Sequence, residues 1–217
     1  MNMRMVTKSR CSTAAAATVA GSRFILVVGI AALAVGLVAS RAQAARGEHG
    51  IVPPQLPANI RVPPGNTPYL LGHAVGTQNY ICLPSGNEFA FKLLTPEATL
   101  FTNAEKQITT HYFSPNPVEG GTTRATWQHR DTSTVWGKVV PGDSAKVNSD
   151  GIEWLKVTVV GTKEGPSGGD ALTRTTFIQR VNTVGGLAPS QGCSSAADVG
   201  TSAFVPYKAD YIFYTDH

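Results

Sequence analysis

Short apolar stretches, broken by turn residues, run through the chain from residue 79 onward and predict β-strands. In residues 154–160, the polar Lys156 and Thr158 alternate with Leu155, Val157 and Val159, which is the period of a half-buried strand. Gly, Pro, Asn and Asp separate most of these stretches. The predicted strands are Asn79–Leu83, Glu88–Leu93, Ile108–Phe113, Ala125–His129, Val135–Val140, Trp154–Val160, Thr175–Val181 and Tyr207–Tyr214.

The same pattern contains one helix candidate, of a turn or two. It covers residues 95–101, with Thr95 as the N-cap and Pro96 at the first helical position. Short strands without long helices between them predict an all-β, mainly antiparallel fold. We therefore expect a sandwich or barrel with long loops and at most one short helix.

The region before the strands divides into two segments. Residues 1–44 hold an apolar run, Phe24–Ala39, with basic residues before it and Ala42 and Ala44 behind it, the order of a signal peptide cleaved after Ala44. At 16 residues, the run is shorter than the roughly 20 that a spanning helix needs. Residues 45–68 contain six prolines and predict an extended lead-in, and residues 69–217 predict a single β domain.

Removal of the leader changes the charge of the chain. The leader holds five of the 18 basic residues and none of the 14 acidic ones, so the remaining 173 residues carry a net charge of −1. The basic residues that remain are scattered, and a nucleic-acid partner is not expected. No transmembrane segment is expected after cleavage, and we expect the protein to be secreted or periplasmic.

Cleavage also leaves two cysteines, Cys82 and Cys193. In an exported domain, two cysteines are expected to form a disulfide, with free buried thiols as the alternative. No CxxC pair can be completed, so a structural zinc site is not expected. The chain has no P-loop and no dinucleotide glycine pattern, and we expect no cofactor.

Several phrases of the sequence together resemble a known family. They are Val75-Gly76-Thr77-Gln78-x-Tyr80-x-Cys82, Pro96-x-Ala98-x-Leu100, His111-Tyr112, Trp127-x-x-x-Asp131-x-Ser133-x-Val135-x-Gly137, Trp154-Leu155, Ile178-Gln179-Arg180-Val181-Asn182-Thr183-x-Gly185-Gly186-x-Ala188-Pro189 and Val205-Pro206-Tyr207-x-Ala209-Asp210-Tyr211. In this order they resemble domain of unknown function 3455, a family of exported bacterial and fungal proteins, over roughly residues 55–214. Thr132 stands where that pattern usually has a turn glycine, and Glu153 where it usually has a proline. The resemblance implies an exported protein and brings no established activity.

Histidines offer the most concrete candidates for chemistry. His111 lies on one predicted strand, and His129 shares a face of another with Asp131. If those strands are neighbours, the three side chains could meet as metal ligands, or as a base with its orienting carboxylate. The alternative is that each histidine is hydrogen-bonded on a sheet face. We do not expect a metal site.

Three further features are candidate binding or catalytic elements. Trp136, between polar neighbours, could be an exposed ring for stacking on a sugar, or it could belong to the core. Gly185 and Gly186 permit unusual backbone angles, so the loop they begin is a candidate binding element. Residues 165–169 match G-x-S-x-G, but a strand rather than a helix follows, which predicts an exposed turn.

Two hypotheses of function follow. The first is an exported, non-enzymatic β domain that binds a small ligand, such as a glycan, or a component of an envelope or host surface. The second is a hydrolase or metal-dependent enzyme that uses His111, His129 and Asp131. Convergence of these three side chains in one pocket would favour the enzyme.

Overall fold

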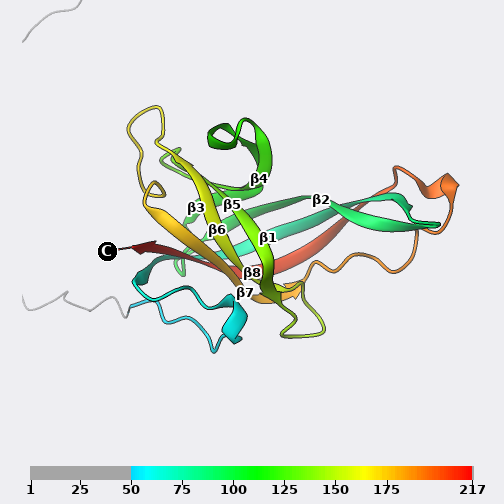
Figure 1. Ribbon diagram of the computed structural model, residues 1–217, viewed down its shortest axis with the longest axis horizontal. Coiled ribbons are helices and arrows are strands. Elements are labelled where there is room, and N and C mark those ends of the chain that lie inside the picture. The colour runs from blue at the N-terminus through cyan, green and yellow to red at the C-terminus, as the bar shows by residue number, and fades with distance from the viewer. Residues whose placement is uncertain (1–49, 217) are drawn as a thin grey trace, which may run out of the picture. The chain divides into compact units, whose positions relative to one another are not determined.

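The chain folds into a closed antiparallel β-barrel (Figure 1). The computed structural model describes residues 50–216, so the predicted leader, residues 1–44, lies outside the described residues. Each strand pairs with the next along the chain, and the last strand closes the barrel on the first. The all-β prediction is confirmed, and the architecture is a barrel. The strands are β1 (Asn66–Ser85), β2 (Glu88–Phe101), β3 (Gln107–Asn116), β4 (Thr122–His129), β5 (Thr134–Ala145), β6 (Trp154–Lys163), β7 (Thr175–Gly185) and β8 (Ser202–Asp216).

The predicted helix at residues 95–101 is wrong, because these residues form the end of β2. Pro96, Ala98 and Leu100 alternate with polar or outward residues, and Ala98 and Leu100 are buried in the barrel. The period of two therefore outweighs the helix-start signal. The Thr95 hydroxyl does not cap a helix; it accepts a hydrogen bond from the backbone N–H of Phe113 on β3.

The helical structure within residues 50–216 consists of three single-turn 3-10 segments. They are η1 (Ala58–Ile60), η2 (Pro117–Glu119) and η3 (Ala196–Asp198). In the same part of the chain, no helix has the length and apolar character needed to cross a membrane.

The core fills the barrel with the inward side chains of all eight strands. One end is closed by Leu172, which lies in the β6–β7 loop and is fully buried. Its backbone N–H donates to the Ser133 hydroxyl in the β4–β5 turn, at 3.2 Å. This hydrogen bond thus holds the β6–β7 loop to the β4–β5 turn at that end of the barrel.

A second, smaller apolar cluster lies on the outside of the barrel. Ile60, from the Pro-rich segment before β1, is fully buried against Trp154, Val181 and Ile212 on the outer face of β6, β7 and β8. The Gln179 side chain donates to the Ile60 carbonyl at 2.6 Å. Residues 50–65 therefore lie along the barrel wall as an extended segment.

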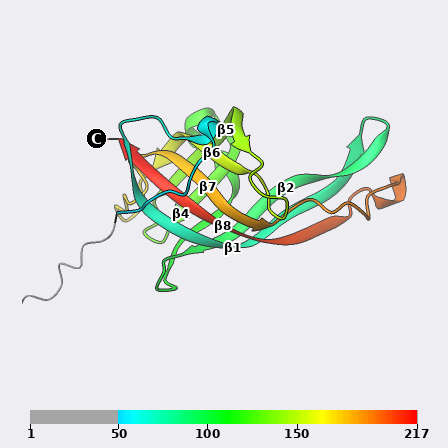
Figure 2. The same ribbon diagram turned by 90° about the horizontal axis from the view of Figure 1, so that it is seen from below.

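Three strands continue past the barrel as an arm (Figures 1 and 2). Only Ala98–Phe101 of β2 pairs with β3, so the earlier part of β2 pairs with β1 alone. β8 pairs with β1 along the same stretch, as far as the pair of Ile81 and Ser202. We call this three-stranded extension, formed by residues 79–97 and 202–206, the arm. It makes β1, at 20 residues, much longer than the strand predicted there.

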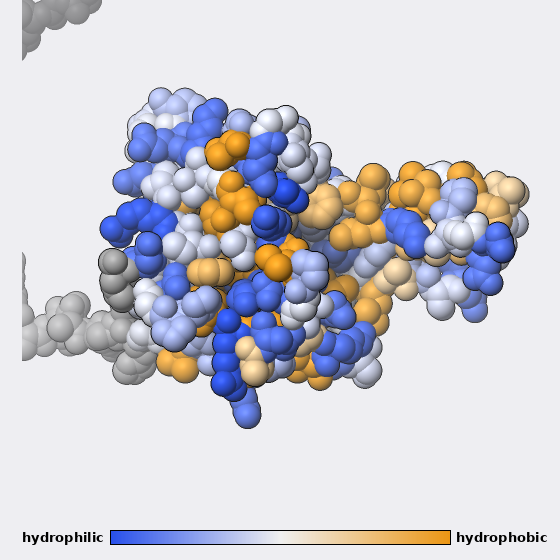
Figure 3. Space-filling model, in the orientation of Figure 1, coloured by the Kyte–Doolittle hydropathy of each residue, from blue (hydrophilic) through white to orange (hydrophobic). Residues whose placement is uncertain are grey.

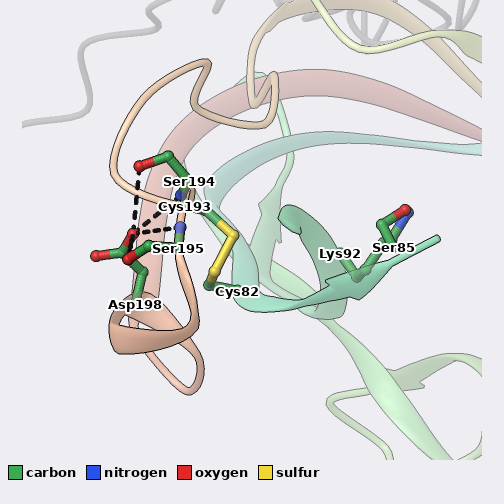
Figure 4. The surroundings of a disulfide bond; sticks show 7 residues. All are labelled: Cys82, Ser85, Lys92, Cys193, Ser194, Ser195 and Asp198. Atoms are coloured by element: carbon green, nitrogen blue, oxygen red, sulfur yellow. Dashed lines mark hydrogen bonds between the residues drawn. A yellow bond between two sulfur atoms is a disulfide. The ribbon is translucent and has the colours of Figure 1, made fainter. Parts of the chain in front are cut away.

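A loop between β7 and β8 is fastened to the arm (Figure 4). We call residues 187–200 of this loop the strap, and none of them is buried. Cys193 of the strap and Cys82 of β1 lie at disulfide distance, as predicted, with their Cα atoms 5.5 Å apart. Asp198 accepts hydrogen bonds from the backbone N–H groups of Ser194 and Ser195, each at 2.9 Å. The strap is therefore held by the bridge and local hydrogen bonds, not by apolar burial.

Candidate functional site

A cavity of about 540 Å³ opens at the barrel end opposite Leu172. Its lining comes from the ends of β1, β3, β5 and β7 and the starts of β2, β4 and β6, and also includes Tyr211 of β8. Two strap residues, Leu187 and Ala188, also line it. In Figure 3, apolar residues gather where the arm leaves the barrel body. The cavity thus lies inside the barrel, at the end from which the arm extends.

An aromatic stack forms the apolar part of the lining. His111 of β3 and Trp127 of β4 are paired in register, and their rings stack 4.3 Å apart at an interplanar angle of 8°. Tyr211 of β8 tilts against both rings, at 5.2 Å and 5.7 Å. The three rings are almost fully buried, so they form an apolar wall of the cavity with a few polar ring atoms in it.

A backbone hydrogen bond and burial determine the tautomer and the protonation state of His111. Its Nδ1 lies 2.9 Å from the Thr126 carbonyl, which can only accept, so Nδ1 carries the proton and Nε2 does not. Burial lowers the pKa of His111 to about 3. The ring is neutral at pH 7, and a group with so low a pKa is a weak general base there.

Arg180 of β7 brings a positive charge to the cavity, opposite Tyr211 of β8. Its Nε and Nη2 atoms donate to the Glu153 carbonyl at 3.2 Å and 2.9 Å. No carboxylate among residues 50–216 forms an ion pair with it. Burial raises the pKa of Tyr211, and the Arg180 guanidinium opposes that rise. Arg180 is thus an unpaired cation in a largely apolar lining.

Gly185 and Gly186 do not line this cavity but directly precede the lining residues Leu187 and Ala188. Both have positive φ, 73° and 78°, and a Cβ on Gly186 would come within 2.9 Å of the Tyr207 Cβ. The Gly186 carbonyl accepts a hydrogen bond from the Tyr80 hydroxyl at 2.5 Å. The glycine pair therefore turns the chain so that Leu187 and Ala188, at the start of the strap, line the cavity.

His129 and Asp131 lie at the other end of the barrel and do not line the cavity that contains His111. Their side chains pair, with Nδ1 and Oδ1 at 2.9 Å. Asp131 also accepts from the Ser133 hydroxyl at 2.6 Å and from the Ala171 N–H at 2.9 Å. Burial alone would raise the pKa of Asp131, but these hydrogen bonds and His129 lower it. The carboxylate holds the Leu172 loop to the β4–β5 turn.

The structure thus brings together two of the three residues of the enzyme hypothesis and separates the third. Across residues 50–216, no three His, Cys, Asp or Glu side chains gather as metal ligands would. In the G-x-S-x-G stretch, Gly165 and Gly169 close a turn through a backbone hydrogen bond of 2.8 Å, and Ser167 is exposed.

Trp136 lies on the outer side of β5, beside the pocket rather than in it. Only 6% of its surface is exposed, and its Nε1 donates to the Ser114 hydroxyl at 2.9 Å. Its ring presents no open face for stacking on a sugar.

No motif in the sequence marks Arg180 or Tyr211 as site residues. Both belong to stretches that carried the family resemblance, Gln179-Arg180-Val181 and Ala209-Asp210-Tyr211. One signal could have singled out Arg180. It lies two residues after Ile178, so the two side chains share a face of the strand, and Ile178 is fully buried. A cation on a buried face is unusual and therefore a candidate for function.

Comparison with known proteins gives one match. A family described as "Protein of unknown function (DUF3455)" matches residues 63–215. No curated protein and no solved structure matches the chain.

Proposed function

This chain belongs to the DUF3455 family of proteins of unknown function, and on that premise we propose that it is an exported, non-catalytic barrel that binds a small, largely apolar molecule. The observation that carries the proposal is the open-ended cavity of about 540 Å³ beside the His111–Trp127 stack. Ligand cavities in proteins measure about 300–1,000 Å³. Eight-stranded barrels are wide enough to hold one small ligand.

Binding is favoured over catalysis because the histidines of the enzyme hypothesis do not supply the cavity with a suitable base. His111 has a pKa of about 3 and is neutral and weakly basic at pH 7. The paired His129 and Asp131 face a structural loop instead of the cavity. An apolar cavity with a few polar groups can still select and orient a ligand.

Export is supported by two independent features. The leader has the order of a signal peptide. Cys82 and Cys193 lie at disulfide distance, and such bridges persist in oxidising compartments. We expect the secreted protein to begin at Ala45, and N-terminal sequencing of material from the host cell envelope or medium checks this. Recovery of the protein with residues 24–39 retained would refute cleavage.

The binding proposal can be tested with N-phenyl-1-naphthylamine, a neutral apolar fluorophore. The chain from Ala45 is used, because residues 46–217 form one compact unit. We expect one probe to bind per chain, with fluorescence gain and quenching of Trp127 emission. Absence of saturable binding would refute the proposed function.

A blocking variant locates the probe. Ala125 lines the cavity, so Ala125→Trp fills it and should abolish binding at a cost of about 1–3 kcal/mol from overpacking. The matched control is Ala104→Trp, an exposed position in the β2–β3 loop at the opposite end of the barrel, and it should bind the probe as the unaltered chain does. Equal binding by both variants would place the probe outside the cavity.

A further inference from the structure

We propose that the natural ligand is an apolar molecule bearing an anionic oxygen group, a carboxylate in the first instance, and that Arg180 binds this group. The inference rests on the proposed function and specifies the chemistry of the ligand. Three independent features of the lining support it: its balance of charge, an unpaired buried hydrogen-bond donor and the position of the guanidinium.

The charge of the lining is predominantly positive. Glu153 is the single acidic residue among the lining residues, and Glu119, outside the lining, neutralises Arg124 at 2.7 Å. Three cations therefore face one carboxylate around the cavity. An anionic ligand gains from this imbalance, and a cationic one is repelled by it. The basic residues in the lining are Arg124, Lys138, Lys146 and Arg180.

The buried polar atoms of the lining point to the same preference. Two lining residues carry a buried side-chain donor, Gln78 through Nε2 and Trp127 through Nε1. Gln78 interacts with the Tyr207 hydroxyl, whereas in the described part of the chain the Trp127 Nε1 has no hydrogen-bond partner and its residue is only 1% exposed. A buried donor without a partner costs about 1–3 kcal/mol, so a ligand rich in acceptor oxygens would relieve that cost.

Arg180 has the geometry to bind a carboxylate. A guanidinium carries five N–H groups, and the contacts of Nε and Nη2 with the Glu153 carbonyl use one of its edges. Its remaining N–H groups include one that donates to the Tyr211 hydroxyl, and a bound carboxylate could share this side of the guanidinium with that hydroxyl. The residue is half-buried among aromatic rings, where a charged hydrogen bond is stronger than in water. The Tyr211 hydroxyl beside it can donate to the same group.

The experiment compares two fluorophores with the same ring skeleton. N-phenyl-1-naphthylamine is neutral, and 8-anilinonaphthalene-1-sulfonate adds one anionic group. We expect the sulfonate to bind the unaltered chain about 10- to 100-fold more tightly than the neutral probe. Arg180→Met should remove this preference while leaving the affinity for the neutral probe within about twofold. Arg180→Lys should retain part of the preference, since it keeps the charge but loses the planar guanidinium.

The controls separate the two proposals. Arg130→Met makes the same change at an exposed position away from the cavity, and it should leave both affinities unchanged. If the neutral probe does not bind, the proposed function fails. If the neutral probe binds and the sulfonate has no advantage, or keeps its full advantage in Arg180→Met, the anion inference fails and the proposed function stands.

One measurement needs no variant, and it applies even if Arg180→Met does not fold. In the unaltered chain, 1-naphthaleneacetate and 1-naphthaleneacetamide compete for the bound neutral probe. They share a shape and differ in one charge. We expect the carboxylate to displace the probe at about tenfold lower concentration. Equal potency of the two compounds, or greater potency of the amide, would overturn the inference.

Discussion

The disulfide between Cys82 and Cys193 should stabilise the whole domain and hold the strap in place. It closes a loop of 111 residues, for which chain entropy predicts a stabilisation of about 4–5 kcal/mol. Strain in the native state and residual structure in the unfolded chain reduce this to about 2–4 kcal/mol. For a domain of this size, the double change Cys82→Ala/Cys193→Ala should lower the Tm by about 5–15 °C.

The double change should destabilise the strap locally as well as the whole domain. No residue of the strap is buried, and besides the local hydrogen bonds of Asp198 it is held to the arm by backbone hydrogen bonds such as Gly200 N–H to the Cys82 carbonyl at 3.0 Å. Without the bridge, amide hydrogen exchange in residues 187–200 should become much faster than in the barrel strands. Leu187 and Ala188 line the cavity, so affinity for the neutral probe should also fall.

The assay pairs urea unfolding with hydrogen exchange read by mass spectrometry, in the double variant and in Ser190→Ala. Ser190 is an exposed strap residue, and its change should alter the free energy of unfolding by less than about 0.5 kcal/mol. A double variant that unfolded at the same urea concentration, with no faster exchange in the strap, would refute the stabilising role of the bridge. A lower free energy of unfolding without faster hydrogen exchange in the strap would mean that the bridge acts on the unfolded chain alone.

Three further predictions concern the barrel. Asp131→Asn should lower the free energy of unfolding by about 1–3 kcal/mol at pH 7. Because the pKa of Asp131 is lowered in the folded chain, the carboxylate stabilises the fold fully above the unfolded pKa near 3.8 and loses this effect in acid. The urea midpoints at pH 7 and pH 3 should therefore differ less in the variant than in the unaltered chain. The pKa of His111 is lowered to about 3 in the folded chain, so below pH 6.5 the unfolded chain binds a proton that the folded chain does not. The free energy of unfolding should therefore fall by roughly 1.4 kcal/mol for each pH unit below 6.5. His111→Phe should flatten that slope in a pH series. Thr132 has a φ of 72°, so Thr132→Gly should raise the Tm through about 0.5–1 kcal/mol of relieved strain, and a gain of the same size in Thr132→Ala would contradict this explanation.

The strand pattern could be predicted from the sequence because it is local. Each of the eight predicted strands lies inside one observed strand, since alternation and turn residues act over a few neighbouring positions. The family pattern has a turn glycine at position 132, which predicts a positive φ there from local sequence as well. Thr132, which replaces this glycine, does adopt a positive φ. The helix at residues 95–101 failed because its start signals are also local, whereas pairing with β1 and β3 is not.

The sequence by itself thus determined the fold class, the positions of the strands, the pairing of Cys82 with Cys193 and the membership of the family. The tertiary structure decided which end of the barrel is open and which side chains meet there. Arg180 and Tyr211 come together through the register of β7 with β8, and His111 and Trp127 through that of β3 with β4. The same register keeps Asp131 away from His111. Closure of the sheet sets these partners, and no local pattern encodes that closure.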